Sequence, residues 1–150
     1  MDRRIARLGT LEECEQFILN VQDKMPDLAR AARRRAVEIQ AARHGAKSAA
    51  EREALEAVYA YERVLSAKHG KKVRASRTWP MIERHGVIKA VERAVNRKAD
   101  TAGYKALAEM GMQDFAFEAV VLRHPDVFSP EAVARSAKRL QGWSSAGGVS

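Results

Sequence analysis

The sequence contains one cysteine, four prolines and nine glycines in 150 residues, and aromatic side chains make up only 6% of it. The single cysteine, Cys14, excludes an intramolecular disulfide and any zinc site built from several thiolates. Scarce glycine and proline, with abundant alanine and arginine, favour helices over strands. The sequence therefore predicts an all-α fold, a single compact bundle of about six or seven helices over residues 1–141, followed by a flexible tail over residues 142–150.

Long apolar runs are also missing. The most hydrophobic stretch, residues 115–122, has eight residues and contains Glu118, whereas a membrane-spanning helix needs about 20 apolar residues. The N-terminus has no apolar run long enough for a signal peptide. These absences predict a soluble, cytoplasmic protein that does not bind membranes.

Acidic side chains are scarce in one window only. Residues 63–98 carry 11 of the 27 Lys and Arg residues but 2 of the 19 acids, a net charge of +9. Residues 1–62 carry 11 charges of each sign, and residues 99–150 carry 5 basic and 6 acidic side chains. The overall excess of +8 therefore lies in one segment. Such segregation predicts a polyanionic partner, and we expect nucleic acid, with duplex DNA favoured over RNA.

Local start and stop signals predict where the helices lie. Thr10 with Glu13, and Ser48 with Glu51, match the capping box, and Pro26 suits the first turn of a helix. Glycines after the second and third helices can close them in the left-handed conformation. The expected helices cover residues 11–23, 26–44, 49–69, two short stretches within 78–97, residues 101–110 capped by Thr101, the very apolar residues 113–124, and 130–141 ending at Gly142.

Helical spacing also predicts which side chains are buried. Cys14 falls on an apolar stripe, which indicates packing rather than a reactive thiol. Arg30, Arg33 and Arg34 are expected on a solvated face, paired locally with acids such as Asp27. The predicted core consists of Val58, Tyr61, Leu65, Phe115, Phe117, Val120 and Val121.

All four histidines precede a glycine or a proline. This position predicts that His44, His69, His85 and His124 end four helices, where a ring N–H can meet unpaired carbonyl groups. Four different helix ends are poorly placed to converge on one ion. We therefore expect neither a metal site nor another cofactor.

Residues 78–97 predict two short helices that meet at a tight turn of Gly86 and Val87. Met81, Gly86, Val87 and Val95 occupy positions that resemble the apolar and glycine positions of helix-turn-helix DNA-binding proteins. The resemblance covers only about 20 of the 150 residues.

Two residues depart from that motif. Ile82 stands where a small residue is usual, and Glu92 stands where the motif buries an apolar side chain. Trp79, beside Pro80, is expected to anchor the helices rather than to stack on a base.

The resemblance implies that the basic side chains face a DNA duplex. Cations before the first helix would contact phosphates and set the register, while Lys89 and Arg93 would enter the major groove and Asn96 could pair with adenine. The predicted nucleic-acid-binding residues are Lys71, Lys72, Arg74, Arg77, Arg84, Lys89, Arg93, Asn96 and Arg97.

Two other functions stay open. The basic face could dock on an acidic protein partner, as an adaptor or inhibitor would, and homodimer formation is not excluded. Asp114 and Glu118, near Glu109 and His124, could hold Mg²⁺ for a nuclease, although a pairing of Glu118 with Arg123 would explain that carboxylate without chemistry. No phosphate-binding glycine loop, nucleophile elbow or metalloprotease motif is present, so we expect a non-catalytic binding protein.

Overall fold

The computed structural model describes residues 2–146, and this part of the chain is helical and contains no β-strand. The predicted all-α class is confirmed, although the helices outnumber the six or seven expected. In chain order they are α1 (Arg3–Ala6), α2 (Leu11–Val21), α3 (Pro26–His44), α4 (Ala49–His69), α5 (Thr78–His85), α6 (Val87–Asn96), α7 (Thr101–Glu109), the 3₁₀ turn η1 (Gln113–Phe115), α8 (Phe117–Arg123) and α9 (Pro130–Ala146).

Most of the predicted helix starts are confirmed. The Thr10 hydroxyl accepts from the Glu13 amide at 3.1 Å, and the Glu13 carboxylate accepts from the Thr10 amide at 3.0 Å, which completes a capping box. Ser48 likewise caps α4, accepting from the Glu51 amide at 3.2 Å. The prediction for α7 was one residue off, because Asp100 rather than Thr101 is its cap and accepts from the Gly103 amide at 2.8 Å.

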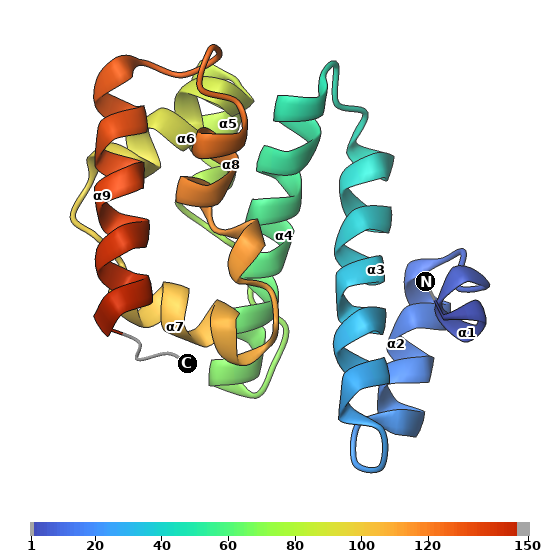
Figure 1. Cartoon of the computed structure of the whole chain (residues 1–150). Coiled ribbons are helices and arrows are strands. Elements are labelled where there is room, and N and C mark those ends of the chain that lie inside the picture. The colour runs from blue at the N-terminus through green and yellow to red at the C-terminus, as the bar shows by residue number, and fades with distance from the viewer. Residues whose placement is uncertain (1, 147–150) are drawn as a thin grey trace.

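Helix α4 stands in the middle of the molecule (Figure 1), with α1–α3 on one side and α5–α9 on the other. Three clusters of buried apolar side chains follow from this arrangement. One lies between α1, α2 and α3 and includes Cys14, whose burial raises the pKa of its thiol. The second joins α3 and α4 to α7 and η1 around Val37 and Phe115. The third joins α4 to α6, α8 and α9 around Val95 and Val120.

The predicted core is confirmed in part. Val58, Phe115, Val120 and Val121 are buried, whereas Tyr61, Leu65 and Phe117 are only half-buried. Tyr61 keeps its hydroxyl at the surface, where it lies 3.3 Å from the Asp100 carboxylate. Of the predicted core residues on α4, Val58 is therefore buried, and Tyr61 and Leu65, nearer the C-terminal end of the helix, are partly open.

The apolar stretch over residues 113–124 is not one helix, as the sequence predicted. Ala116 adopts an extended conformation (φ −59°, ψ 146°) between η1 and α8. The break lets Phe115 pack in the cluster around Val37 while Val120 packs in the cluster around Val95. The interruption thus allows neighbouring residues of one apolar stretch to pack in two different clusters.

Helix α9 continues past Gly142 to Ala146, so the predicted stop at that glycine is wrong. Trp143 stabilises the added turn, because its ring stacks on Tyr104 at 4.6 Å and its indole N–H donates to the Thr101 hydroxyl at 3.0 Å. The end of the predicted flexible tail, residues 147–150, lies outside the described residues.

Candidate nucleic-acid interface

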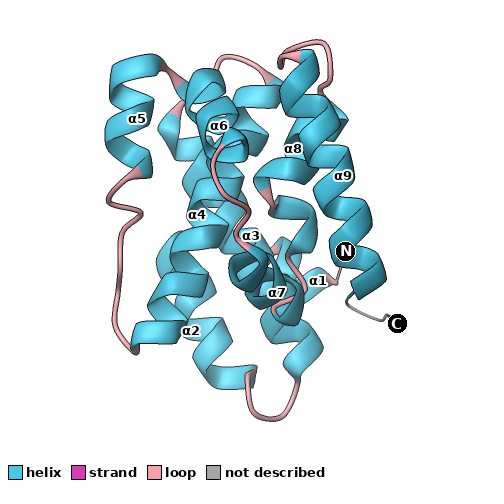
Figure 2. Cartoon of the chain, turned by 90° about the vertical axis from the view of Figure 1, so that its left-hand side faces the viewer, coloured by secondary structure: helices cyan, strands magenta, loops and turns pink. Residues whose placement is uncertain are grey.

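The connection from α4 to α5, residues 70–77, runs as a loop along the outside of the molecule (Figure 2). Its end is fastened by Glu62, a buried carboxylate on α4 that accepts from the Ala75 amide at 2.8 Å and from the Trp79 indole N–H at 2.6 Å. The Arg74 side chain lies 3.3 Å from the same carboxylate and over the Trp79 ring. One acid of α4 therefore sets where the basic segment enters α5.

Trp79 packs between elements, as the sequence predicted. Its ring stacks on His44 at 5.5 Å and meets Tyr59 in a tilted arrangement at 5.2 Å. With its N–H donated to Glu62, this indole is occupied by contacts within the protein. It joins the start of α5 to the end of α3 and the middle of α4.

Gly86 alone forms the turn between α5 and α6. Its φ of 86° and ψ of 165° lie in a region that L side chains rarely adopt, so glycine is required there. Val87, which the sequence placed in the turn, is the first residue of α6. The two helices are thus joined by one residue fewer than predicted.

Helix α6 has one buried and one exposed face. Ala90, Val91 and Val95 are buried against the central core. Lys89, Arg93 and Asn96, at spacings of four and three, are exposed; we call these three residues the α6 stripe. Buried alanine and valine on one side and cations on the other arise directly from the helical period.

Glu92 does not share that exposed face. It is half-buried, and its carboxylate accepts from the Ser129 amide at 2.5 Å, just before α9. The acid that departs from the helix-turn-helix pattern is therefore used to fix α6 against α9.

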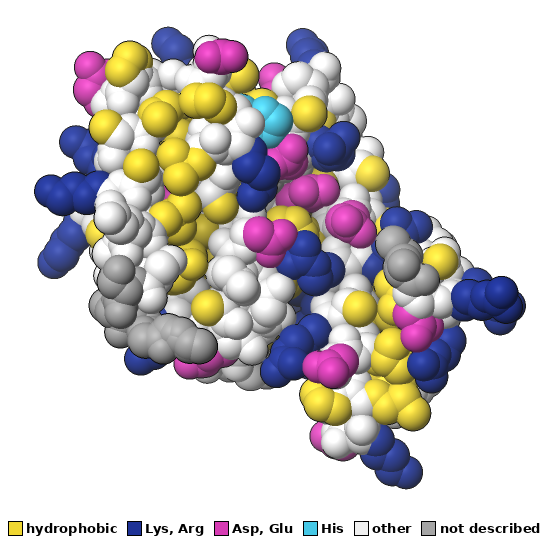
Figure 3. Space-filling view, viewed as in Figure 1, with side chains coloured by type: hydrophobic (Ala, Val, Ile, Leu, Met, Phe, Trp, Pro, Cys, Tyr) yellow, Lys and Arg dark blue, Asp and Glu magenta, His cyan; other side chains and the backbone are white. Residues whose placement is uncertain are grey.

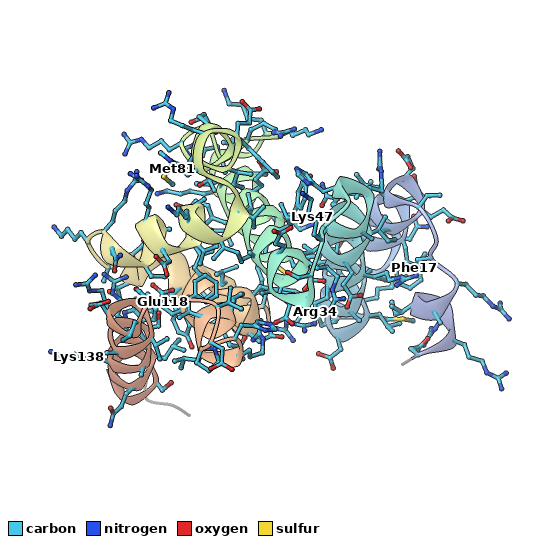
Figure 4. All side chains as sticks on the ribbon, turned by 90° about the horizontal axis from the view of Figure 1, so that it is seen from above. Phe17, Arg34, Lys47, Met81, Glu118 and Lys138 are labelled. Carbon is cyan, nitrogen blue, oxygen red and sulfur yellow. The ribbon has the colours of Figure 1, made fainter. Side chains whose placement is uncertain are left out.

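A shallow groove lies beside α5, and we call it the basic groove. It is lined by Ser76, Arg77, Pro80, Met81, Arg84, His85 and Arg97. Viewed from above, α5 projects from the molecule with Met81 at its side and nitrogen-tipped side chains pointing outward (Figure 4). Three of the nine predicted binding residues line this groove.

The charges of the groove and of the α6 stripe act on His85. Partial desolvation, followed by the nearby Arg93, Arg84 and Lys89, lowers the pKa of His85. Desolvation is the larger cause, and the three nearby cations add to it because like charges disfavour the protonated ring. The fold therefore gathers cations from α5 and α6 around one point, and His85, predicted only as a helix end, lies within this surface.

The other predicted residues are arranged differently. Lys71 and Lys72 lie at the opposite end of the connecting loop, next to the end of α4. Arg74 is paired with Glu62, and the Asn96 side chain accepts from Arg135. Arg97 donates to the Met81 sulfur at 3.3 Å. Arg77, Arg84, Lys89 and Arg93 have no hydrogen-bond or ion-pair partner within residues 2–146 and are exposed.

The acids proposed for a nuclease do not come together. Asp114 is held by both terminal nitrogens of Arg34 at 2.7 Å, which lowers the pKa of that carboxyl. Glu118 pairs at 3.1 Å with Arg139, not with Arg123 as considered from the sequence. Acidic and basic side chains lie close together along the seam between α3 and η1, where Arg34 meets Asp114 (Figure 3). Among the described residues there is no group of three His, Cys, Asp or Glu side chains placed to hold a metal ion.

Three of the predicted histidines are the last residues of α3, α4 and α5, and His124 directly follows α8. His124 also makes a contact that its position did not predict, because its Nε2 lies 2.9 Å from a Glu53 carboxylate oxygen. Burial opposes ionisation of Glu53, but hydrogen bonds from Arg123 and His124 still lower its pKa. This cluster joins α4 to α8 and serves the packing of the two helices.

No protein-family model, curated protein or solved structure matches this chain. No helix within residues 2–146 is long and apolar enough to cross a membrane.

Proposed function

We propose that the protein binds nucleic acid, with duplex DNA as the preferred form, through the basic groove and the α6 stripe, and without catalysis of its own. The observation that carries the proposal is the set of four exposed cations, Arg77, Arg84, Lys89 and Arg93, which have no partner within the described chain. Other arginines, such as Arg34, Arg123 and Arg139, instead pair with acids at short distances. Cations left unpaired on one surface are available to phosphates.

The shape of this surface supports a duplex. Helix α6 is ten residues long, roughly 15 Å, and presents its cations along one edge. An α-helix fits the major groove, and Arg and Lys can donate to a guanine edge there. The first amides of α6 have no side-chain cap, so they can donate to a phosphate in line with the helix dipole.

The test is fluorescence anisotropy of labelled duplex DNA, duplex RNA and single strands, titrated at several salt concentrations. The basic groove and the α6 stripe together carry five cations, namely Arg77, Arg84, Arg97, Lys89 and Arg93. If all five contact phosphates, a plot of the logarithm of the binding constant for duplex DNA against the logarithm of the salt concentration is expected to have a slope of about −4 to −5. Tighter binding of single strands or hairpins would point instead to RNA-type recognition. No binding of any nucleic acid at low salt would overturn the proposal and direct the search to an acidic protein surface.

A matched pair of variants locates the site. The triple change Arg84→Gln, Lys89→Gln and Arg93→Gln removes three charges from the proposed surface. The control Arg3→Gln, Lys24→Gln and Lys105→Gln removes three charges from exposed positions elsewhere. We expect at least a tenfold loss for the first variant and a much smaller loss for the second. Equal losses would mean that net charge, not this surface, drives binding.

A further inference from the structure

A second hollow lies between α2, α3, α4 and the start of the loop after α4. It has a volume of about 470 Å³, within the size range of small-molecule sites. Leu11, Ile18 and Tyr59 form apolar parts of its wall, while Arg33, Arg63 and Lys72 bring three cations to it. The start of the loop after α4 therefore adds Lys72 and Val73 to a hollow built mainly by α2, α3 and α4.

The structure places Arg33 differently from the sequence prediction, which put it on a solvated, locally paired face with Arg30 and Arg34. Arg30 does pair with Asp27 at 3.0 Å, and Arg34 reaches across to Asp114. Arg33 is half-buried, and within residues 2–146 its guanidinium has no hydrogen-bond or ion-pair partner. Burial, with the neighbouring charges of Arg63 and Arg30, lowers the pKa of Arg33.

Arg63 adds an unused donor at the same place. One terminal nitrogen donates to Glu15 at 2.8 Å, but the buried Nε has no partner among the described atoms. A buried N–H without an acceptor has lost its hydrogen bond to water without gaining another. Two guanidinium groups that repel each other are stabilised when an anion binds between them.

The charges that face the hollow identify the class of anion. Arg33, Arg63 and Lys72 supply three positive charges, and Glu15 offsets the one on Arg63. Glu62 also lines the hollow but is occupied by Arg74, the Ala75 amide and Trp79. The remaining excess of two charges matches a phosphate monoester, which is close to a dianion at neutral pH and offers three acceptor oxygens. A carboxylate carries only one charge.

We propose that this hollow, the Arg33–Arg63 site, binds a small phosphate monoester, with the phosphate between the two guanidinium groups and Lys72, and an apolar or ring portion against Leu11, Ile18 and Tyr59. This site is separate from the basic groove and does not depend on nucleic-acid binding. Inorganic phosphate, a phosphorylated metabolite and the terminal phosphate of an oligonucleotide share the recognised group.

Isothermal titration calorimetry of the full chain with four probes tests the proposal. Phenyl phosphate is expected to bind more tightly than inorganic phosphate. It should bind at least about tenfold more tightly than benzoate, which has the same ring but only one negative charge. Phenol, which is uncharged, should show no binding. An oligonucleotide with and without a terminal phosphate distinguishes the source of the group. If phenyl phosphate and benzoate bound equally well, or if neither bound, the proposal would be overturned by these measurements on the unmutated protein alone.

Variants then place the ligand. Arg33→Gln should weaken phenyl phosphate binding about tenfold or more, whereas Arg43→Gln, at an exposed position near the end of the same helix, should leave it unchanged. The Arg84, Lys89 and Arg93 triple variant should also leave it unchanged, so that failure of this site and failure of the nucleic-acid surface can be told apart. Binding that is unaffected by Arg33→Gln in a folded protein would show that the phosphate does not lie here.

Discussion

Helix α3 and the surface of α5 and α6 both carry several cationic side chains, but the fold uses them in different ways. Three of the five arginines of α3 have partners within the protein: Arg30 pairs with Asp27, Arg34 clamps Asp114, and Arg35 donates to the Leu8 carbonyl at 3.0 Å. On α5 and α6, Arg84 and Arg93 have no partner within residues 2–146. The comparison shows that cation content alone does not mark a binding surface, because an arginine across from an acid is part of the packing.

The largest effect on stability is expected for an arginine whose ion pair is buried. Arg139→Met would leave the buried Glu118 carboxylate without its partner at 3.1 Å, because within residues 2–146 Glu118 makes no other ion pair. The free energy of unfolding, measured in urea, is expected to fall by about 3–5 kcal/mol.

The double variant Arg139→Met and Glu118→Leu serves as the control, since removing both charges should restore most of the lost stability. A fall of less than about 1 kcal/mol for Arg139→Met alone would show that the pair is effectively solvated.

The next effect concerns the acid that fastens the basic segment to α4. Glu62→Ala would leave the Ala75 amide and the Trp79 indole N–H without their acceptor. We expect a loss of about 1–3 kcal/mol in unfolding free energy and faster hydrogen exchange of the amides in residues 73–79. Glu83→Ala, an exposed acid on α5, should change stability by less than about 0.5 kcal/mol; unchanged exchange in Glu62→Ala would mean that the loop is held by other contacts.

A smaller effect on stability distinguishes an arginine that is paired within the protein from one that is available to a ligand. Arg34→Gln should lower the free energy of unfolding by about 1 kcal/mol, because its pair with Asp114 is bidentate but partly exposed. Arg84→Gln should change stability by no more than about 0.5 kcal/mol and should weaken binding of duplex DNA instead. If both variants lost stability equally, the surface of α5 would be part of the packing as α3 is.

Signals within a few residues allowed much of the fold to be predicted. The Thr10–Glu13 box, Pro26 and the Gly86 turn depend on side chains three or four positions away at most, and each is found in the structure. Partners distant in the sequence could not be predicted in the same way. Arg34 meets an acid 80 positions away and Arg139 an acid 21 positions away, and only the packing of α3, α8 and α9 brings them together.

In the candidate site, too, features that depend on neighbouring residues could be predicted, and features that depend on distant residues could not. The α6 stripe could be predicted because its spacing is local, and Lys89 and Arg93 are exposed as expected. The separation of Lys72 from that stripe could not, because it depends on how the loop after α4 turns toward α2 and α3. A basic run in the sequence is therefore divided by the fold between two surfaces.

The smallest effect is expected in acid. The hydrogen bonds from Arg34 hold the pKa of Asp114 below its usual value of 3.8. In the unfolded chain this carboxyl takes up a proton more readily, so the pair stabilises the protein above about pH 4 and the contribution disappears as the pH falls through the lower, folded value. Asp114→Asn should therefore be less stable than the natural chain at neutral pH, and the urea midpoints of the two should converge toward pH 2. In the Arg34→Gln background the same change should have little effect at either pH, because the cation that lowers the pKa is absent. A constant difference between the two proteins across this range would show that the Asp114 side chain stabilises the seam by its shape rather than by its charge.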